Sequence, residues 1–234
     1  MQINIPELPR SPYGLLVMSA VAIGFVVAVL FMRRFKVAKE TIFYTCLLTL
    51  VCTLFGAILM EFKFTSEGIQ LGFSGLGAVV GMALGIFISS LIMRDKPECI
   101  MASFVVAAPL MYGLAKFGCL FAGCCHGKDY TGPFALVYTG VHAGSYFPTQ
   151  FIDMASFILI HILAVILVTK LRNKLKAIYI IISITLPVRF VLEYLRYYHN
   201  GSFIAPQQIT VLIAGALSVT ILIIWQKALK INYR

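Results

Sequence analysis

Long uninterrupted apolar stretches constrain this chain more than any other feature of its sequence. A membrane-spanning helix needs about 20 consecutive apolar residues, and hydropathy over windows of about 19 residues is the usual way to find one. Seven segments qualify, near Tyr13–Met32, Thr41–Met60, Phe73–Met93, Cys99–Ala122, Thr149–Leu171, Ala177–Leu195 and Pro206–Trp225. The sequence therefore predicts an all-α, polytopic membrane protein with about seven transmembrane helices.

Composition supports this fold class and excludes others. Only 12% of the 234 residues are charged and 60% are hydrophobic, whereas soluble proteins carry roughly 25% charged residues. The apolar runs are continuous, which disfavours a β-barrel, and no GxGxxG or GxxxxGK[ST] motif indicates nucleotide binding. No repeat or long linker divides residues 1–234, so we expect a single integral membrane domain, although the connection 123–148 could re-enter the membrane and change the span count.

Basic residues are distributed unevenly between alternate connections. One set holds 13 of them, namely Arg33, Arg34, Lys36, Lys39, Arg94, Lys96, Lys170, Arg172, Lys174, Lys176, Lys227, Lys230 and Arg234. The other set holds 4, namely Arg10, Lys63, Lys128 and Arg196. The positive-inside rule then places the N-terminus outside and the C-terminus inside. The formal charge of +10 thus reflects membrane topology, and we expect no nucleic-acid partner.

In this topology, ionisable side chains of separate helices meet at the depth of the outer leaflet. Arg189, Glu193 and Arg196 are spaced by four and three residues, on one helical face. Polar residues near the outer ends of other segments are Tyr13, Lys116, Gln150, Asp153 and Gln208. Ionisable residues inside a membrane are costly and by default indicate function. Two structural alternatives remain: a plain ion pair of Arg189 with Glu193, and snorkelling of Lys116 and Arg196 to lipid headgroups.

A cluster of cysteines follows the fourth apolar segment. Cys119, Cys124, Cys125 and His126 lie within eight residues. Thiolates and imidazole can bind a metal, but a second ligand pair at the spacing of a tetrahedral site is absent, so we expect no metal. A disulfide or a redox relay is an alternative, although no CxxC is present. The third interpretation is a tight helix exit that places His126 and backbone N–H groups beside a ligand.

Several motifs, in order along the chain, resemble those of the prolipoprotein diacylglyceryl transferase family. The resemblance rests on the runs 13–16 (YGLL), 72–81 (GFSGLGAVVG), 116–127 (KFGCLFAGCCHG), 148–151 (PTQF) and 189–196 (RFVLEYLR), followed by Gln208. The corresponding family motifs include G-R-x-G-N-F-x-N-G-E-x-x-G and R-F-x-x-E-x-x-R. Five positions depart from the family, because Leu76, Lys116, Cys119, Cys124 and Phe147 stand where it has His, Arg, Asn, Glu and His.

The resemblance implies a phospholipid-dependent transferase in the bacterial cytoplasmic (inner) membrane, without a cofactor. It would move a diacylglyceryl group from a phosphatidylglycerol-like donor to an extracytoplasmic thiol or other nucleophile, such as a prolipoprotein cysteine. Catalytic roles fall to Arg189, Glu193 and His126. Arg189, together with Lys116, would hold the phosphate, and Glu193 would position Arg189 or act as general base. His126 is a candidate acid or base, because histidine titrates near neutrality. Substrate-binding roles fall to Tyr13, Lys116, Gln150, Arg196 and Gln208. The alternatives are a membrane thiol oxidoreductase and a lipid-binding or transport protein without catalysis.

Overall fold

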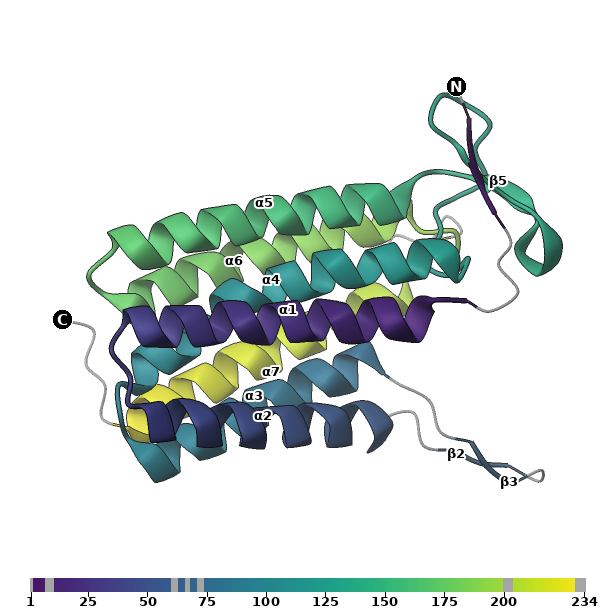
Figure 1. The fold of residues 1–234 in the computed structure, drawn as a ribbon. Coiled ribbons are helices and arrows are strands. Elements are labelled where there is room, and N and C mark those ends of the chain that lie inside the picture. Colours follow the sequence, from purple (N-terminus) through teal and green to yellow (C-terminus); the bar gives the residue numbers. More distant parts are fainter. Residues whose placement is uncertain are drawn as a thin grey trace. The chain divides into compact units, whose positions relative to one another are not determined.

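The computed structural model describes residues 2–6, 11–59, 63–65, 68–70, 74–199 and 204–229. Its helices are α1 (Tyr13–Arg34), α2 (Lys39–Leu59), α3 (Gly75–Met93), α4 (Pro97–Phe121), α5 (Thr149–Lys170), α6 (Lys174–Leu192) and α7 (Pro206–Ala228) (Figure 1). Arg10, Gly72, Phe73, Lys230 and Arg234 lie outside the described residues, as do the side chains of Lys63 and Leu76.

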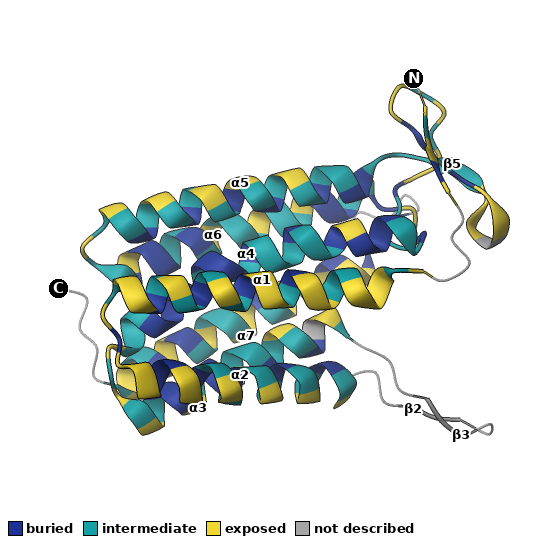
Figure 2. Ribbon diagram, in the orientation of Figure 1, coloured by how far each residue is buried: buried dark blue, intermediate teal, exposed yellow. Residues whose placement is uncertain are grey.

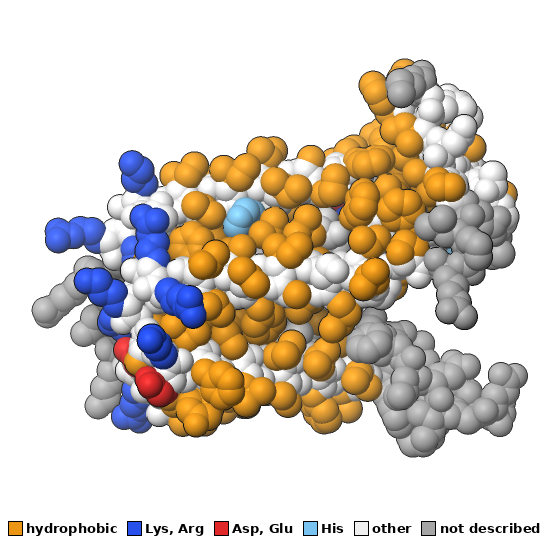
Figure 3. All heavy atoms as spheres, in the orientation of Figure 1, with side chains coloured by type: hydrophobic (Ala, Val, Ile, Leu, Met, Phe, Trp, Pro, Cys, Tyr) orange, Lys and Arg blue, Asp and Glu red, His pale blue; other side chains and the backbone are white. Residues whose placement is uncertain are grey.

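Each predicted apolar segment coincides with one of these helices, which confirms the all-α polytopic membrane fold. Within the described residues, six helices are long and apolar enough to cross a membrane, while α3 is apolar but shorter. Exposed residues recur along the helices (Figure 2). Many of them are large and hydrophobic, among them Leu15 at 72%, Phe55 at 65% and Leu159 at 65% exposure. In the view of Figure 3, hydrophobic side chains cover the helix flanks, and Lys and Arg lie at helix ends. The orientation of the termini stays a prediction.

Local sequence signals account for several helix ends. The Asn173 side chain caps α6 by accepting from the Lys176 amide at 3.0 Å, which satisfies a donor that the helix leaves free. Pro206 is the first residue of α7, where its missing N–H costs nothing. Arg33 and Arg34 lie in the last turn of α1, where positive charge complements the helix dipole.

The chain divides into two compact units, and α1, α4 and α7 contribute residues to both. One unit contains Met1–Val27 and Phe104–Ile213, and the other contains Ala28–Ser103 and Ala214–Arg234. In the second unit, α3 packs on α2 through glycines, because a Cβ on Gly81 would lie 2.0 Å from the Cys52 carbonyl oxygen. A Cβ on Gly85 would lie 2.6 Å from Thr49 Cα. The two helices therefore approach closely at these two positions, where a larger residue would clash.

A small sheet precedes α5 in the first unit. Strand β1 (Ile3–Ile5) pairs in parallel with β4 (Leu136–Tyr138), which pairs antiparallel with β5 (Gly144–Tyr146). A 3-10 turn, Gly140–His142, joins β4 and β5, and Leu120 of α4 packs under the sheet. The connection 123–148 thus folds as strands and turns and not as a re-entrant helix. In the other unit, β2 (Lys63–Thr65) and β3 (Gly68–Gln70) form an antiparallel pair.

Candidate active site

The end of α6 holds the predicted pair of Arg189 and Glu193. The two side chains form an ion pair at i, i+4, and the Glu193 side chain is fully buried. The Tyr198 hydroxyl also donates to Glu193. Burial, together with this hydrogen bond, raises the pKa of Tyr198, so the hydroxyl stays protonated as a donor. Glu193 is therefore held on two sides, and the predicted ion pair is confirmed.

Asp153, on the first turns of α5, extends this pair into a larger network. Its Oδ2 lies 3.4 Å from Lys116 Nζ and also pairs with the Arg196 guanidinium. Arg196 Nε lies 4.0 Å from Glu193 Oε2. Lys116 and Arg196 are 7% and 1% exposed, so the alternative that they snorkel to headgroups is wrong. We call these five residues, Lys116, Asp153, Arg189, Glu193 and Arg196, the charged network.

Tyr112, one turn before Lys116 on α4, lies between two cations of the network. Lys116 Nζ is 4.8 Å and Arg189 Cζ 5.5 Å from the centre of its ring, within the range of a cation–π attraction. The Tyr112 hydroxyl is buried and, among the described residues, has no hydrogen-bond partner. Buried polar groups are normally paired, so this hydroxyl is available to a ligand of the network.

The cysteine loop, residues 119–125, turns sharply at the end of α4. Gly123 has φ +63° and Cys125 has φ +57°, a left-handed conformation that glycine adopts freely and other residues rarely. A Cβ on Gly123 would also lie 2.7 Å from the His142 ring. This bend brings the Sγ atoms of Cys119, Cys124 and Cys125 within 4.8 Å of one another. Within the described residues, these three are the group that could hold a metal ion.

Polar side chains from α5 and from the charged network fix the backbone of this loop. Gln150 Nε2 donates to the Cys124 carbonyl at 3.0 Å, and Thr149 Oγ1 donates to the Cys125 carbonyl at 3.1 Å. The Arg196 guanidinium donates to the same Cys125 carbonyl. The Cys124 thiol donates to the Cys119 carbonyl at 3.8 Å. The loop is therefore rigid and adjoins the charged network through Arg196.

The other predicted site residues lie apart from the network. The His126 ring stacks between Tyr146 and Tyr197, at 3.9 and 4.4 Å between ring centres, and its Nδ1 is 3.2 Å from the Gly127 carbonyl oxygen. Tyr13 begins α1 and packs against α4, where a Cβ on Gly118 would lie 3.3 Å from its ring. The structure thus places these two side chains beside the cysteine loop and not among the charges.

Gln208 holds the start of α7. Its Oε1 accepts from the Ala205 amide at 2.9 Å, and its Nε2 donates to the Phe190 carbonyl of α6 at 3.4 Å. Both ends of the amide are therefore engaged in joining two helices. These two hydrogen bonds explain why Gln208 is buried, and the explanation needs no substrate contact.

Three residues of the site were not predicted: Asp153 as its centre, Tyr112 and Tyr198. Asp153 is the acidic residue of the fifth apolar segment, which was a usable signal because a carboxylate in a membrane helix requires a partner. Tyr112 and Tyr198 had no comparable signal, since buried tyrosines are common in apolar cores.

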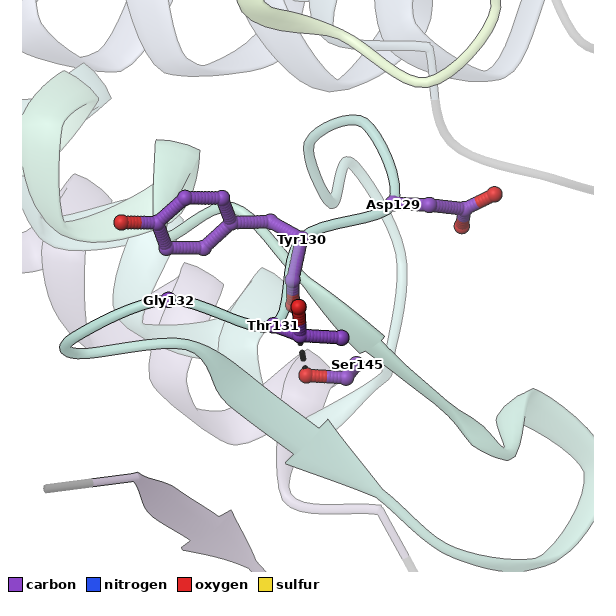
Figure 4. A pocket seen from close by; sticks show the side chains of 5 residues that line it. All are labelled: Asp129, Tyr130, Thr131, Gly132 and Ser145. Atoms are coloured by element: carbon purple, nitrogen blue, oxygen red, sulfur yellow. Dashed lines mark hydrogen bonds between the residues drawn. The ribbon is translucent and has the colours of Figure 1, made fainter.

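The first unit also has an open hollow, which is lined by neither the charged network nor the cysteine loop. Asp129, Tyr130, Thr131, Gly132 and Ser145 line it, and the Ser145 hydroxyl donates to the Tyr130 carbonyl at 2.6 Å (Figure 4). None of the predicted site residues is among these five. The charged network with the cysteine loop is therefore the candidate active site.

Comparison with known proteins gives two matches. A family model described as prolipoprotein diacylglyceryl transferase matches residues 1–228. A protein of Clostridium perfringens (strain 13 / Type A), named Phosphatidylglycerol--prolipoprotein diacylglyceryl transferase 2, is 30% identical over 113 residues. That aligned stretch covers 43% of this chain and 43% of the relative, less than half of each.

Proposed function

The chain belongs to the prolipoprotein diacylglyceryl transferase family, and from this premise we propose that it transfers a diacylglyceryl group from phosphatidylglycerol to a thiol. The acceptor class is an extracytoplasmic thiol such as a prolipoprotein cysteine. The site faces the outer leaflet of the bacterial cytoplasmic membrane. The name of the Clostridium perfringens relative specifies phosphatidylglycerol as the donor and a prolipoprotein as the acceptor.

The charge of the network is the observation that carries this proposal. Lys116, Arg189 and Arg196 supply three positive charges, whereas Asp153 and Glu193 supply two negative ones. A buried charge without a counter-charge is unfavourable in a low-dielectric interior. The phosphodiester of phosphatidylglycerol carries one negative charge, so it completes the balance.

Arg189 is the cation best placed to meet the lipid. Its side chain is 24% exposed, whereas those of Lys116 and Arg196 are buried at 8% and 1%. A guanidinium binds two phosphate oxygens at once. It also stabilises the charge that develops on the phosphate as the bond from the glyceryl carbon to the phosphate oxygen breaks. Glu193 and the Tyr112 ring hold this guanidinium in place.

The reaction is a substitution at the glyceryl carbon. The acceptor sulfur forms a bond to that carbon, and the bond to the phosphate oxygen breaks. The electron pair leaves with glycerol phosphate, and the thiol proton goes to a base. Glu193 is the base we assign, and His126 at the edge of the cysteine loop is the second candidate. Gln150 holds the loop through the Cys124 carbonyl, and Tyr13 lies beside the loop against α4.

Substitutions that keep size and hydrogen bonding test this assignment. Arg189→Lys retains the charge but not the planar fork, and Glu193→Gln can still hydrogen-bond Arg189 but cannot accept a proton. We expect both variants to fold and to lose transfer of labelled diacylglyceryl to a cysteine peptide by on the order of 100-fold. The exposed Arg172 offers the matched control, since Arg172→Lys should transfer at the parent rate.

Three outcomes separate the proposal from its rivals. Two stable and fully active variants would leave Arg189 and Glu193 as structural residues and refute the mechanism. Lipid binding without turnover in either the parent or Glu193→Gln would favour a non-catalytic lipid-binding protein. The neighbouring thiols of the cysteine loop favour one further class, a membrane thiol oxidoreductase. Quinone-dependent oxidation of those thiols without lipid transfer would support it.

A further inference from the structure

The cysteine loop gathers three thiols where the resembled motif has none. Their sulfur atoms lie within 4.8 Å of one another, Cys119 is buried, and Cys124 and Cys125 are partly buried. We propose that Cys119, Cys124 and Cys125 bind a zinc ion as thiolates and leave its fourth position open for the acceptor thiol. The metal site stands on these residues alone, while its role with an acceptor rests on the proposed function.

The separations of the three sulfur atoms are close to those of a zinc site. Zinc binds thiolate sulfur at about 2.3 Å, so two sulfurs of a tetrahedral site lie about 3.8 Å apart. The sulfur atoms here need to approach by about 1 Å at most from their 4.8 Å limit. Side-chain rotation supplies a movement of that size without a change in the backbone.

The backbone of the loop is already shaped and fixed for this purpose. A non-glycine residue at positive φ, such as Cys125, costs about 1–3 kcal/mol and persists only where its surroundings hold it. Donors from Gln150, Thr149 and Arg196 hold the Cys124 and Cys125 carbonyls. Metal ligands are typically held in place by hydrogen bonds from residues that do not themselves touch the metal.

The number of ligands indicates an open site. The sequence expectation of no metal concerned a structural zinc site, which has four protein ligands, whereas catalytic zinc sites have three and keep a position for water or substrate. His126 does not complete the set in this structure, because its ring stacks between Tyr146 and Tyr197 and its Nδ1 faces the Gly127 carbonyl. The group in the described residues therefore has three members.

With an open zinc position, the cysteine loop would activate the acceptor thiol of the transfer reaction. A thiol that coordinates zinc is deprotonated outright, and the thiolate is the nucleophilic form of cysteine. The acceptor sulfur then bonds to the glyceryl carbon, and the electron pair of the broken carbon–oxygen bond leaves on the phosphate. Glu193, the base assigned above, takes up the proton released on coordination. Zinc keeps its oxidation state, so the step needs no redox partner.

Metal binding is measured first, on detergent-purified full-length protein with all thiols reduced. The probes are Zn²⁺, counted per chain by mass spectrometry, and Cd²⁺, followed by its ultraviolet thiolate absorption. We expect one ion per chain in the parent and in the control Cys46→Ser, whose cysteine lies on α2. Cys119→Ser, Cys124→Ser and Cys125→Ser should each lose most of the binding. Zinc should also raise the melting temperature of the unmodified chain, a readout that needs no variant.

Two results would overturn the metal site. One is a fully reduced parent protein that holds no ion after incubation with either metal. The other is a cadmium absorption that persists in all three cysteine variants, which would place the ion elsewhere. Stoichiometric copper with zinc excluded would likewise reject zinc as the occupant.

The open position is tested with Co²⁺ in place of zinc. A cysteine peptide should shift the visible cobalt spectrum, and the same peptide with serine should not, because only the thiol enters the coordination sphere. Transfer at the full rate by metal-free protein would reject this role and leave the proposed function standing. A spectral shift with no lipid transfer under any condition would keep the metal site and reject the proposed function.

Discussion

Asp153 pairs with two buried cations, so its carboxylate is the most informative single position in the charged network. In Asp153→Asn the side chain keeps its shape and an acceptor oxygen but loses its negative charge. Lys116 and Arg196 then remain buried beside each other, with Glu193 Oε2 at 4.0 Å from Arg196 Nε. We expect a loss of stability from uncompensated charge and not from a cavity.

The expected loss follows from the depth of the partners. Breaking a buried ion pair by removing one member costs about 3–5 kcal/mol, and both cations here are less than a tenth exposed. For a chain of this size each kcal/mol lowers the melting temperature by about 2–4 °C. Asp153→Asn should therefore melt roughly 6–20 °C below the parent protein.

A second substitution shows whether charge is the cause. Lys116→Met in the Asp153→Asn background removes one of the two orphaned cations while keeping an apolar chain. We expect the double variant to melt above Asp153→Asn, with a coupling of about 0.5–3 kcal/mol between the sites. Thermal melting of detergent-purified protein measures both effects, and the exposed Asp129 provides the control Asp129→Asn. Melting of Asp153→Asn at the parent temperature, or strictly additive effects in the double variant, would refute the reasoning.

Other predictions concern the base, the cysteine loop and the topology. Tyr198→Phe removes a donor to the Glu193 carboxylate, a contact worth about 1.5–3 kcal/mol, and should lower transfer in the labelled-lipid assay without unfolding the protein. Gly123→Ala should lower the melting temperature by several degrees, because its φ of +63° is unfavourable for alanine. In intact cells an impermeant maleimide should label Thr131→Cys, and it should label Arg172→Cys only after permeabilisation.

Matched variants define what would contradict these expectations. Tyr197→Phe changes the adjacent tyrosine and should keep activity, so equal losses in both variants would remove the special role of Tyr198. Gly14→Ala has open space at its Cβ and should melt at or above the parent temperature. A Gly123→Ala variant that behaves in the same way would mean that the loop tolerates other conformations. Reversed labelling would invert the topology and place the site at the inner leaflet.

The sequence predicted the helices well because span length is a property of each segment by itself. A run of about 20 apolar residues becomes a membrane helix whatever its neighbours are, and α5 begins at Thr149 as expected. The pair of Arg189 and Glu193 was equally accessible, since a spacing of four residues on one helix brings side chains together. Strands of three residues, such as β4, are too short to give a periodic signal.

Contacts between helices were harder to predict from the sequence, for a physical reason. Hydropathy gives the length of a helix but not its rotation about its axis, so it does not tell which side chains face one another. Lys116 and Arg196 fitted a snorkelling interpretation as well as a buried one, and the decision came from Asp153 on a different helix. Gln208 fitted a binding role until its two hydrogen bonds joined α6 to α7.

Arg196 connects the two halves of the candidate site, the charged network and the cysteine loop. Its guanidinium pairs with Asp153 in the charged network and donates to the Cys125 carbonyl in the cysteine loop. One rigid, planar guanidinium would thus position the donor phosphate at the charged network and the acceptor thiol at the cysteine loop. Substitution at carbon requires the two reactants to be aligned, and a misplacement of about 1 Å can cost about 100-fold in rate. A buried arginine with both contacts satisfies that requirement better than a snorkelling one, because its side chain is not free to follow the lipid surface.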